Sequence, residues 1–170
     1  MPGTVLGIGL GGFVDGILLH QLLQWHHMLS SAGSDRLGLP PYPVTTVSGL
    51  RINTVWDGLL HTVTWLAVLT GLGLLYSRVT TSRGQVWISR ALWGWILVGW
   101  GVFNFVEGLV DHQILGIHHV RSGPRQLWWD LGFLALGGAG PGRLAGCSVA
   151  RGRWTSPAIP AAPRPGDDPR

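Results

Sequence analysis

Long apolar runs alternate with short polar connections along the chain. A bilayer-spanning helix needs roughly 20 mostly apolar residues, and three runs reach that length. These runs extend from Thr4 to Leu29, from Thr54 to Tyr76 and from Ala91 to Ile117. A fourth run begins at Leu127 and is interrupted by Pro141 and Arg143. The pattern predicts an all-α integral membrane protein with four helices, the fourth being the weakest.

The polar stretches predict how the helices are connected. The first connection, SSAGSDRLGLPPYPV, contains three prolines and is expected to be an external loop without regular structure. The tail RGRWTSPAIPAAPRPGDDPR is rich in Pro, Ala and Arg and has no helical or strand period. We therefore expect a four-helix transmembrane domain over residues 1–150 and a disordered cytoplasmic tail over residues 151–170.

One motif occurs twice, 92 positions apart. FVDGILLHQLLQWHHMLS, which begins at Phe13, matches FVEGLVDHQILGIHHVRS, which begins at Phe105. The matched polar pairs are Asp15 with Glu107, His20 with His112, His26 with His118, and His27 with His119. Trp56-Asp57 similarly matches Trp129-Asp130. The chain is therefore predicted to be a four-helix bundle of two similar helix pairs, parallel and related by an axis along the membrane normal.

Composition supports the membrane interpretation. Only 12% of the residues are charged, against roughly 25% in a soluble domain. The formal charge is +4, but the positive side chains are all Arg and lie between apolar runs or in the tail. This distribution is typical of membrane flanks and does not indicate a nucleic-acid partner. A single cysteine, Cys147, excludes a disulfide framework and a thiolate zinc site.

Arginine counts near the helix ends predict orientation. Arg is more frequent in the second connection and the tail than in the first and third connections. By the positive-inside rule we expect both termini to be cytoplasmic. The indole rings expected at the outer boundary belong to Trp25, Trp56, Trp128 and Trp129.

Spacing predicts which polar side chains share a helix face. Positions seven apart return to nearly the same face of an α-helix. We therefore expect His20 to lie on one face with His27, and His112 with His119. Positions eleven apart are also nearly in phase, which relates Asp15 to His26 and Glu107 to His118. Asp57 and His61 form an i, i+4 pair on the second helix.

Carboxylates and imidazoles inside a bilayer usually face the interior of the protein and pair with other polar groups there. Their number here predicts a polar site in the outer half of the helices that holds one or two cations. Imidazole with carboxylate suits Fe, Zn, Mn or Cu(II), whereas Cu(I) prefers sulfur ligands. The candidate metal ligands are Asp15, His20, His26, His27, Asp57, His61, Glu107, Asp111, His112, His118 and His119.

Several alternatives stay open at this point. Haem could bind between two of His20, His61 and His112, although the nearby carboxylates argue against it. The same residues could form a proton or metal-ion conduit or an interhelical hydrogen-bond network. The protein could also be a membrane assembly factor in which they hold a structural metal. Asp111 and Asp130 could instead cap helix starts or pair with Arg121 or Arg125. No nucleophile with a plausible nearby base stands out, so nucleophilic catalysis has no support. Whether the protein is an enzyme, has protein partners or forms a homo-oligomer is left open.

The motifs carry a resemblance to a known family. GFVDGILLHQLLQWHHMLS, WDGLLH, NFVEGLVDHQILGIHHVRS and WDLGFL resemble an uncharacterised family of predicted bacterial membrane proteins, domain of unknown function 2243. The resemblance covers roughly residues 5 to 137. It implies a multi-helix integral membrane protein of the bacterial inner membrane and, by itself, no activity. The last helix of that family usually continues as an apolar run, whereas Gly137 to Arg143 breaks it here.

Overall fold

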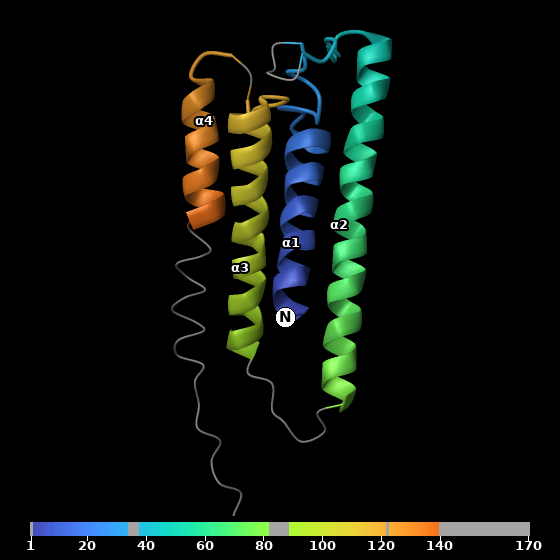
Figure 1. Cartoon of the computed structure of the whole chain (residues 1–170), viewed down its shortest axis with the longest axis vertical. Coiled ribbons are helices and arrows are strands. Elements are labelled where there is room, and N and C mark those ends of the chain that lie inside the picture. Colours follow the sequence, from blue (N-terminus) through green and yellow to red (C-terminus); the bar gives the residue numbers. More distant parts are fainter. Residues whose placement is uncertain (1, 34–37, 82–88, 122, 140–170) are drawn as a thin grey trace, which may run out of the picture.

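The computed structural model describes residues 2–33, 38–81, 89–121 and 123–139, and the regular structure within these ranges is all helical. The long elements are α1 (Pro2–Val14), α2 (Val47–Thr81), α3 (Ser89–Glu107) and α4 (Gln126–Phe133). Three of them continue directly into a wider, π-helical stretch. These stretches are η1 (Asp15–Leu22) after α1, η2 (Gly108–Leu115) after α3 and η3 (Leu134–Ala139) after α4. In Figure 1, α1 and α3 run in one direction and α2 and α4 in the other.

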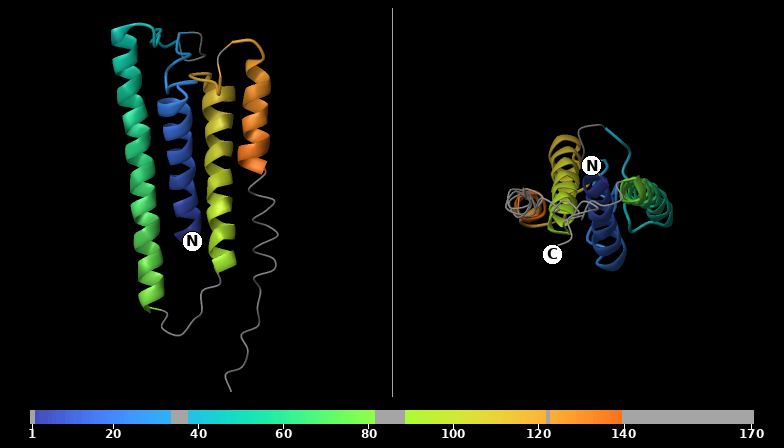
Figure 2. Two further views of the ribbon diagram at one scale, coloured as in Figure 1. Left: turned by 180° about the vertical axis from the view of Figure 1, so that it is seen from behind. Right: turned by 90° about the horizontal axis from the view of Figure 1, so that it is seen from below.

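The four helices stand side by side in a row. Helices α1 and α3 pack together at the centre, α2 lies against the outer side of α1, and η3 below α4 packs against α3. The view along the helices in Figure 2 shows the same order. The all-helical prediction is confirmed, whereas this row does not confirm the four-helix bundle expected from the sequence.

Glycines bring the central helix backbones into contact. A Cβ atom at Gly7 would lie 1.9 Å from the carbonyl oxygen of Ile96, and one at Gly99 would lie 2.0 Å from that of Thr4. A side chain at either position would therefore force the helices apart. Small residues are the usual means of close helix packing in membranes, where lipid offers no hydrophobic drive for association.

Three helices are long and apolar enough to cross a membrane: Pro2–Leu22, Val47–Thr81 and Arg90–Leu115. The second begins before the expected Thr54 because the Thr46 hydroxyl accepts a hydrogen bond from the Gly49 amide at 3.1 Å and so caps it. The fourth helix is not among the three, and its expected interruption at Pro141 and Arg143 lies outside the described residues. So does the expected tail, residues 151–170.

Two helices end earlier than the apolar runs predict. The first helical stretch ends at Leu22 instead of Leu29, and the third ends at Leu115 instead of Ile117. Gln24 and Gly116 have positive φ angles of 48° and 67°, which an α-helix does not accommodate. The histidine pairs expected on helix faces therefore lie on the irregular segments that follow. The predicted pairs are still brought together, since His20 and His27 share a carboxylate partner and Asp15 lies near His26, but the chain between them is not one continuous α-helix.

Candidate metal centre

The π-helical turns place an acid and a histidine five residues apart beside each other. On an α-helix, positions five apart point about 140° away from each other, since each residue turns about 100°. In η1 the Nε2 atom of His20 instead lies 3.3 Å from Oδ2 of Asp15. In the second copy, Nε2 of His112 lies 3.1 Å from Oε1 of Glu107. Both turns thus aim an imidazole and a carboxylate at the same point.

The irregular segments after η1 and η2 return a second histidine from each half. His26 and His118 stack on each other, with ring centroids 4.9 Å apart and an interplanar angle of 7°. Each also contacts the helical histidine of its own half edge-on: His20 lies 4.5 Å from His26, and His112 lies 4.8 Å from His118. Four imidazoles from the two copies of the motif therefore form one cluster.

Hydrogen bonding fixes which nitrogen of His26 is free. Its Nδ1 atom lies 2.9 Å from the Val120 carbonyl oxygen, which can only accept, so Nδ1 carries the proton. Burial lowers the pKa of His26 from 6.5 to about 3, so the ring is neutral. Its buried Nε2 then carries a bare lone pair and has no hydrogen-bond partner among the described residues. A neutral imidazole with a free lone pair is the form that binds metals.

The opposing histidine, His118, is neutral for the same reason. Burial lowers its pKa from 6.5 to about 3, and the neighbouring His112 and His20 lower it further. Its Nε2 atom lies 2.9 Å from Oε1 of Glu107, while the second oxygen of that carboxylate, Oε2, is buried without a partner among the described residues.

Two overlapping groups of side chains have the geometry to hold an ion. One comprises His26, Glu107, His112 and His118, and the other comprises Asp15, His20 and His26. Within each group the candidate ligand atoms all lie within 4.8 Å of one another. None of the six residues is more than 7% exposed. Because His26 belongs to both groups, they form one continuous site.

A second pair of carboxylates orients the histidines. Oδ1 of Asp57 lies 3.0 Å from Nδ1 of His20 and accepts the Met28 amide at 3.0 Å, and its Oδ2 lies 2.5 Å from Nδ1 of His27. Such carboxylates fix the ring orientation and tautomer of a ligating histidine and raise its basicity.

Asp130 makes the matching contacts in the second copy. Its Oδ1 atom lies 3.5 Å from Nδ1 of His112 and accepts a hydrogen bond from the Val120 amide at 3.0 Å, and its Oδ2 atom lies 2.7 Å from Nδ1 of His119. The sequence prediction did not include Asp130 among the site residues. The match of Trp129-Asp130 with Trp56-Asp57 was the signal that could have identified it.

The remaining predicted residues take other positions. His27, His119 and Asp57 lie in the orienting layer and belong to neither group that could hold an ion. His61 bonds through Nδ1 to the Asp57 backbone carbonyl at 2.7 Å and lies against Gly16. Asp111 lines a cavity beside the cluster. The structure therefore brings six of the eleven predicted residues together as candidate ligands.

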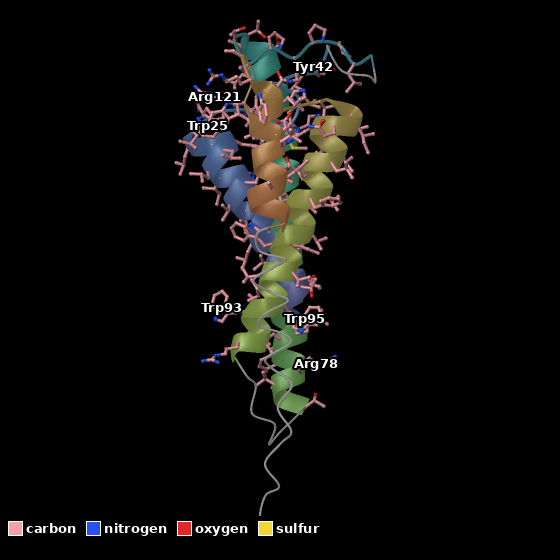
Figure 3. The ribbon with its side chains drawn as sticks, turned by 90° about the vertical axis from the view of Figure 1, so that its left-hand side faces the viewer. Trp25, Tyr42, Arg78, Trp93, Trp95 and Arg121 are labelled. Atoms are coloured by element: carbon pink, nitrogen blue, oxygen red, sulfur yellow. The ribbon has the colours of Figure 1, made fainter. Side chains whose placement is uncertain are left out.

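Aromatic residues and an arginine cover the cluster end of the molecule. The guanidinium of Arg121 lies 5.7 Å from the Trp25 ring centroid and 5.5 Å from the Trp129 ring centroid. Figure 3 shows Trp25 and Arg121 at the same end as Tyr42, with Arg78 at the opposite end. This cation-π clamp joins the segment after η1 to α4.

The fold and the site together define a helical membrane protein with a buried cluster of histidines and carboxylates near one end. The chain belongs to the DUF2243 family, described as a predicted membrane protein, whose model matches residues 2–149. The resemblance found in the sequence is thereby confirmed and extends further toward the C-terminus than expected. Neither a curated protein nor a solved structure matches the chain.

Proposed function

We propose that this protein binds a transition-metal ion inside the membrane, through histidines and carboxylates contributed by both copies of its repeated motif. The observation that carries the proposal is the six-residue cluster of Asp15, His20, His26, Glu107, His112 and His118, every member of which is at least nine-tenths buried. A purely structural network would satisfy its own polar atoms, but this cluster leaves several unpaired.

The unpaired atoms carry a large free-energy cost. Oδ1 of Asp15, Oε2 of Glu107 and Nε2 of His26 are all buried without a hydrogen-bond partner among the described residues. An unsatisfied buried polar group costs about 1–3 kcal/mol, and a charged group costs more. Cations bound in the two groups would remove this cost, because Asp15 belongs to one group, Glu107 to the other and His26 to both, and all three atoms have free lone pairs.

The donor set favours a borderline cation. Three imidazoles with one carboxylate, as in the group around Glu107, suit Zn(II), Fe(II), Mn(II) or Cu(II). Ligands are present for a second ion around Asp15 and His20, and the two ions would share or compete for His26. The candidate set contains no sulfur ligand, which disfavours Cu(I).

We further propose that the two halves are copies of one helix pair that bind the ion at their interface. The matched contacts support this arrangement: the His20 to His118 and His26 to His112 ring distances are 6.0 and 6.1 Å. The four-residue group takes His26 from the first half and Glu107, His112 and His118 from the second, so both halves are needed to complete that group. Haem between His26 and His118 is less compatible, because their stacked rings leave no room for a porphyrin between them.

Metal analysis of the purified full chain tests the proposal. We expect protein from metal-replete cells to retain about one or two equivalents of a transition metal by mass spectrometry. His26→Gln and His112→Gln are expected to lose it, whereas His61→Gln, outside both groups, is expected to keep it. X-ray absorption of the metal-bound protein should show nitrogen and oxygen ligands without sulfur.

Helical content and elution volume in detergent establish that each variant is folded. Wild-type protein that is metal-free after replete growth, and that binds none of the four metals on titration, would overturn the proposal. So would a folded His26→Gln, His112→Gln double variant that retains the full metal content. A Soret absorption band in the wild type would replace the metal-ion proposal with haem.

A further inference from the structure

The first connection covers part of the cluster end of the molecule. Leu29 and Ile117, which follow η1 and η2 respectively, are buried together in a small apolar core. Leu39 and Tyr42 of that connection pack against this core. The chain thus supplies its own cover for these two positions.

The motif repeat relates this covered core to an exposed group of residues. Arg121 occupies the position that Leu29 has in the first copy, and Trp25 occupies the position that Ile117 has in the second. Arg121 is exposed, and so is Trp129, at 40%. The connection from η2 to α4 is shorter than the one from η1 to α2, so less chain is available to cover this group. The counterpart of a self-covered core is therefore open to the surroundings.

The guanidinium of Arg121 is held in place here but keeps its hydrogen-bond donors. It lies 5.7 Å and 5.5 Å from the ring centroids of Trp25 and Trp129, which are themselves 5.7 Å apart. Contact with ring faces leaves the N–H groups, which point outward in the guanidinium plane, available to an acceptor. The ion pairs among the described residues all join a histidine to an acid, so no carboxylate there neutralises Arg121 or the exposed Arg125. The backbone carbonyl of Arg125 accepts a hydrogen bond from the Trp129 amide at 3.3 Å, so this second arginine begins beside the same group.

Depth in the membrane indicates which anion these arginines meet. Two candidate spans end at Leu22 and Leu115, and Trp25 and Arg121 follow these ends closely. Indole rings and guanidinium groups at the ends of spans lie at the level of the lipid headgroups. Phospholipid phosphates lie at that level, and a guanidinium binds a phosphate through two parallel N–H donors. A zwitterionic headgroup carries its own cation, so two arginines without a carboxylate partner favour a headgroup with a net negative charge.

We infer that Arg121, held between Trp25 and Trp129, binds the phosphate group of an anionic phospholipid, and that Arg125 adds a second positive charge to this site. The lipid takes the place that the first connection has over the equivalent positions of the other copy. The assignment does not depend on a bound metal ion.

Binding at this clamp acts directly on the segments that carry the stacked histidines. Trp25 directly precedes His26 in the chain, and Arg121 directly follows Val120. The carbonyl oxygen of Val120 lies 2.9 Å from Nδ1 of His26, so the two segments are already joined there. A lipid bound at the clamp therefore restrains both segments at once.

Native mass spectrometry of the full chain in detergent tests the inference. The two probes are phosphatidylglycerol and phosphatidylcholine with identical acyl chains, so that only the headgroup differs. We expect phosphatidylglycerol to bind at about a tenth of the concentration that phosphatidylcholine requires, since choline offsets the charge-assisted contact. In nanodiscs, phosphatidylglycerol should also slow amide hydrogen exchange in the segments that follow η1 and η2.

Two variants and one matched control locate the site. Arg121→Leu installs the residue of the first copy and should abolish the preference for phosphatidylglycerol. Arg121→Lys keeps the charge without the planar pair of donors and should lose most of the preference. Arg78→Leu removes an exposed arginine at the opposite end of the molecule and should leave the preference intact (Figure 3). Unchanged helical content and elution volume show that each variant is folded.

Equal binding of the two lipids, or a full preference in Arg121→Leu or Arg121→Lys, would overturn the inference. Displacement of bound phosphatidylglycerol by an equal concentration of glycerol phosphate would assign the clamp to a water-soluble phosphate compound and reject the lipid. These results are separable from failure of the metal proposal. Metal-bound protein without lipid selectivity rejects the lipid site alone, whereas lipid-selective protein without metal rejects the metal centre alone.

Discussion

The histidines of the cluster are held by groups that do not themselves reach the candidate ion site. Asp57 and Asp130 each contact two imidazoles and a backbone amide. The Nε2 atoms of Gln21 and Gln113 lie 3.5 Å from Oδ2 of Asp57 and of Asp130, respectively. Asp57 therefore joins α2 to η1 and to the segment that follows η1, and Asp130 joins α4 to η2 and to the segment that follows η2. This layer fixes the ring orientation of His20 and His112, the two cluster imidazoles that it contacts.

Removing the charge of one orienting acid is expected to weaken metal binding without removing a ligand. In Asp130→Asn the side chain keeps its shape but no longer raises the basicity of His112. Metal affinity should fall about 10- to 100-fold, the usual effect of losing such a partner. Competition with a fluorescent chelator measures it. Asp111→Asn, which changes an acid outside the orienting layer, serves as the control, and equal affinity in the two variants would contradict the role of Asp130.

The sequence could predict the residues of the site but not their division into ligands and orienting groups. The repeated motif identified all six members of the cluster, because polar side chains in an apolar run stand out. It could not show that His61 bonds to its own helix, or that Asp130 matters as much as Asp57. Those roles depend on π-helical turns and on positive φ angles at Gln24 and Gly116, and a count of 100° per residue contains neither.

At the scale of helices, the central contact is set by small residues at matched positions. Gly7 and Gly99 are 92 positions apart in the sequence and contact each other's helices in the same way, at Ile96 and Thr4. The close approach holds α1 and α3 near enough for η1 and η2 to share one cluster. Helix packing and site assembly are therefore coupled.

Gly7→Ala is expected to destabilise the protein strongly, because the new methyl group would lie 1.9 Å from a backbone oxygen that cannot move alone. The cost should be about 3 kcal/mol, measured as a lower thermal unfolding midpoint in detergent. A matched change, Gly73→Ala, meets nothing within 4 Å and should stabilise α2 slightly, by up to about 1 kcal/mol. A Gly7→Ala protein as stable as Gly73→Ala would show that the two backbones are not in contact.

Helix number and class were predictable, whereas helix ends and order were not. Apolar runs longer than a bilayer identified the three candidate spans, since length and hydropathy are local properties. The ends at Leu22 and Leu115 were missed because apolar residues continue past them into segments buried by tertiary contacts, as Leu29 and Ile117 are. The row of helices follows from glycine contacts between α1 and α3, which no single run reveals.

The whole molecule is polarised along its helices. Trp25, which directly precedes His26 of the cluster, lies with Arg121 at one end, and Arg78 lies at the other (Figure 3). Arginine is more frequent in the second connection and the tail than at the cluster end. By the positive-inside rule we expect this asymmetry to put the cluster near the outer surface.

Cysteine labelling of intact cells tests that orientation. In a Cys147→Ser background, Thr45→Cys lies in the exposed connection at the cluster end, and Ser77→Cys lies in the exposed last turns of α2. A membrane-impermeant maleimide should label position 45 in intact cells and position 77 only after permeabilisation, because a charged reagent does not cross the hydrocarbon core. The reverse pattern would place the cluster on the cytoplasmic side, and a metal ion would then be acquired from the cytoplasm instead of from outside.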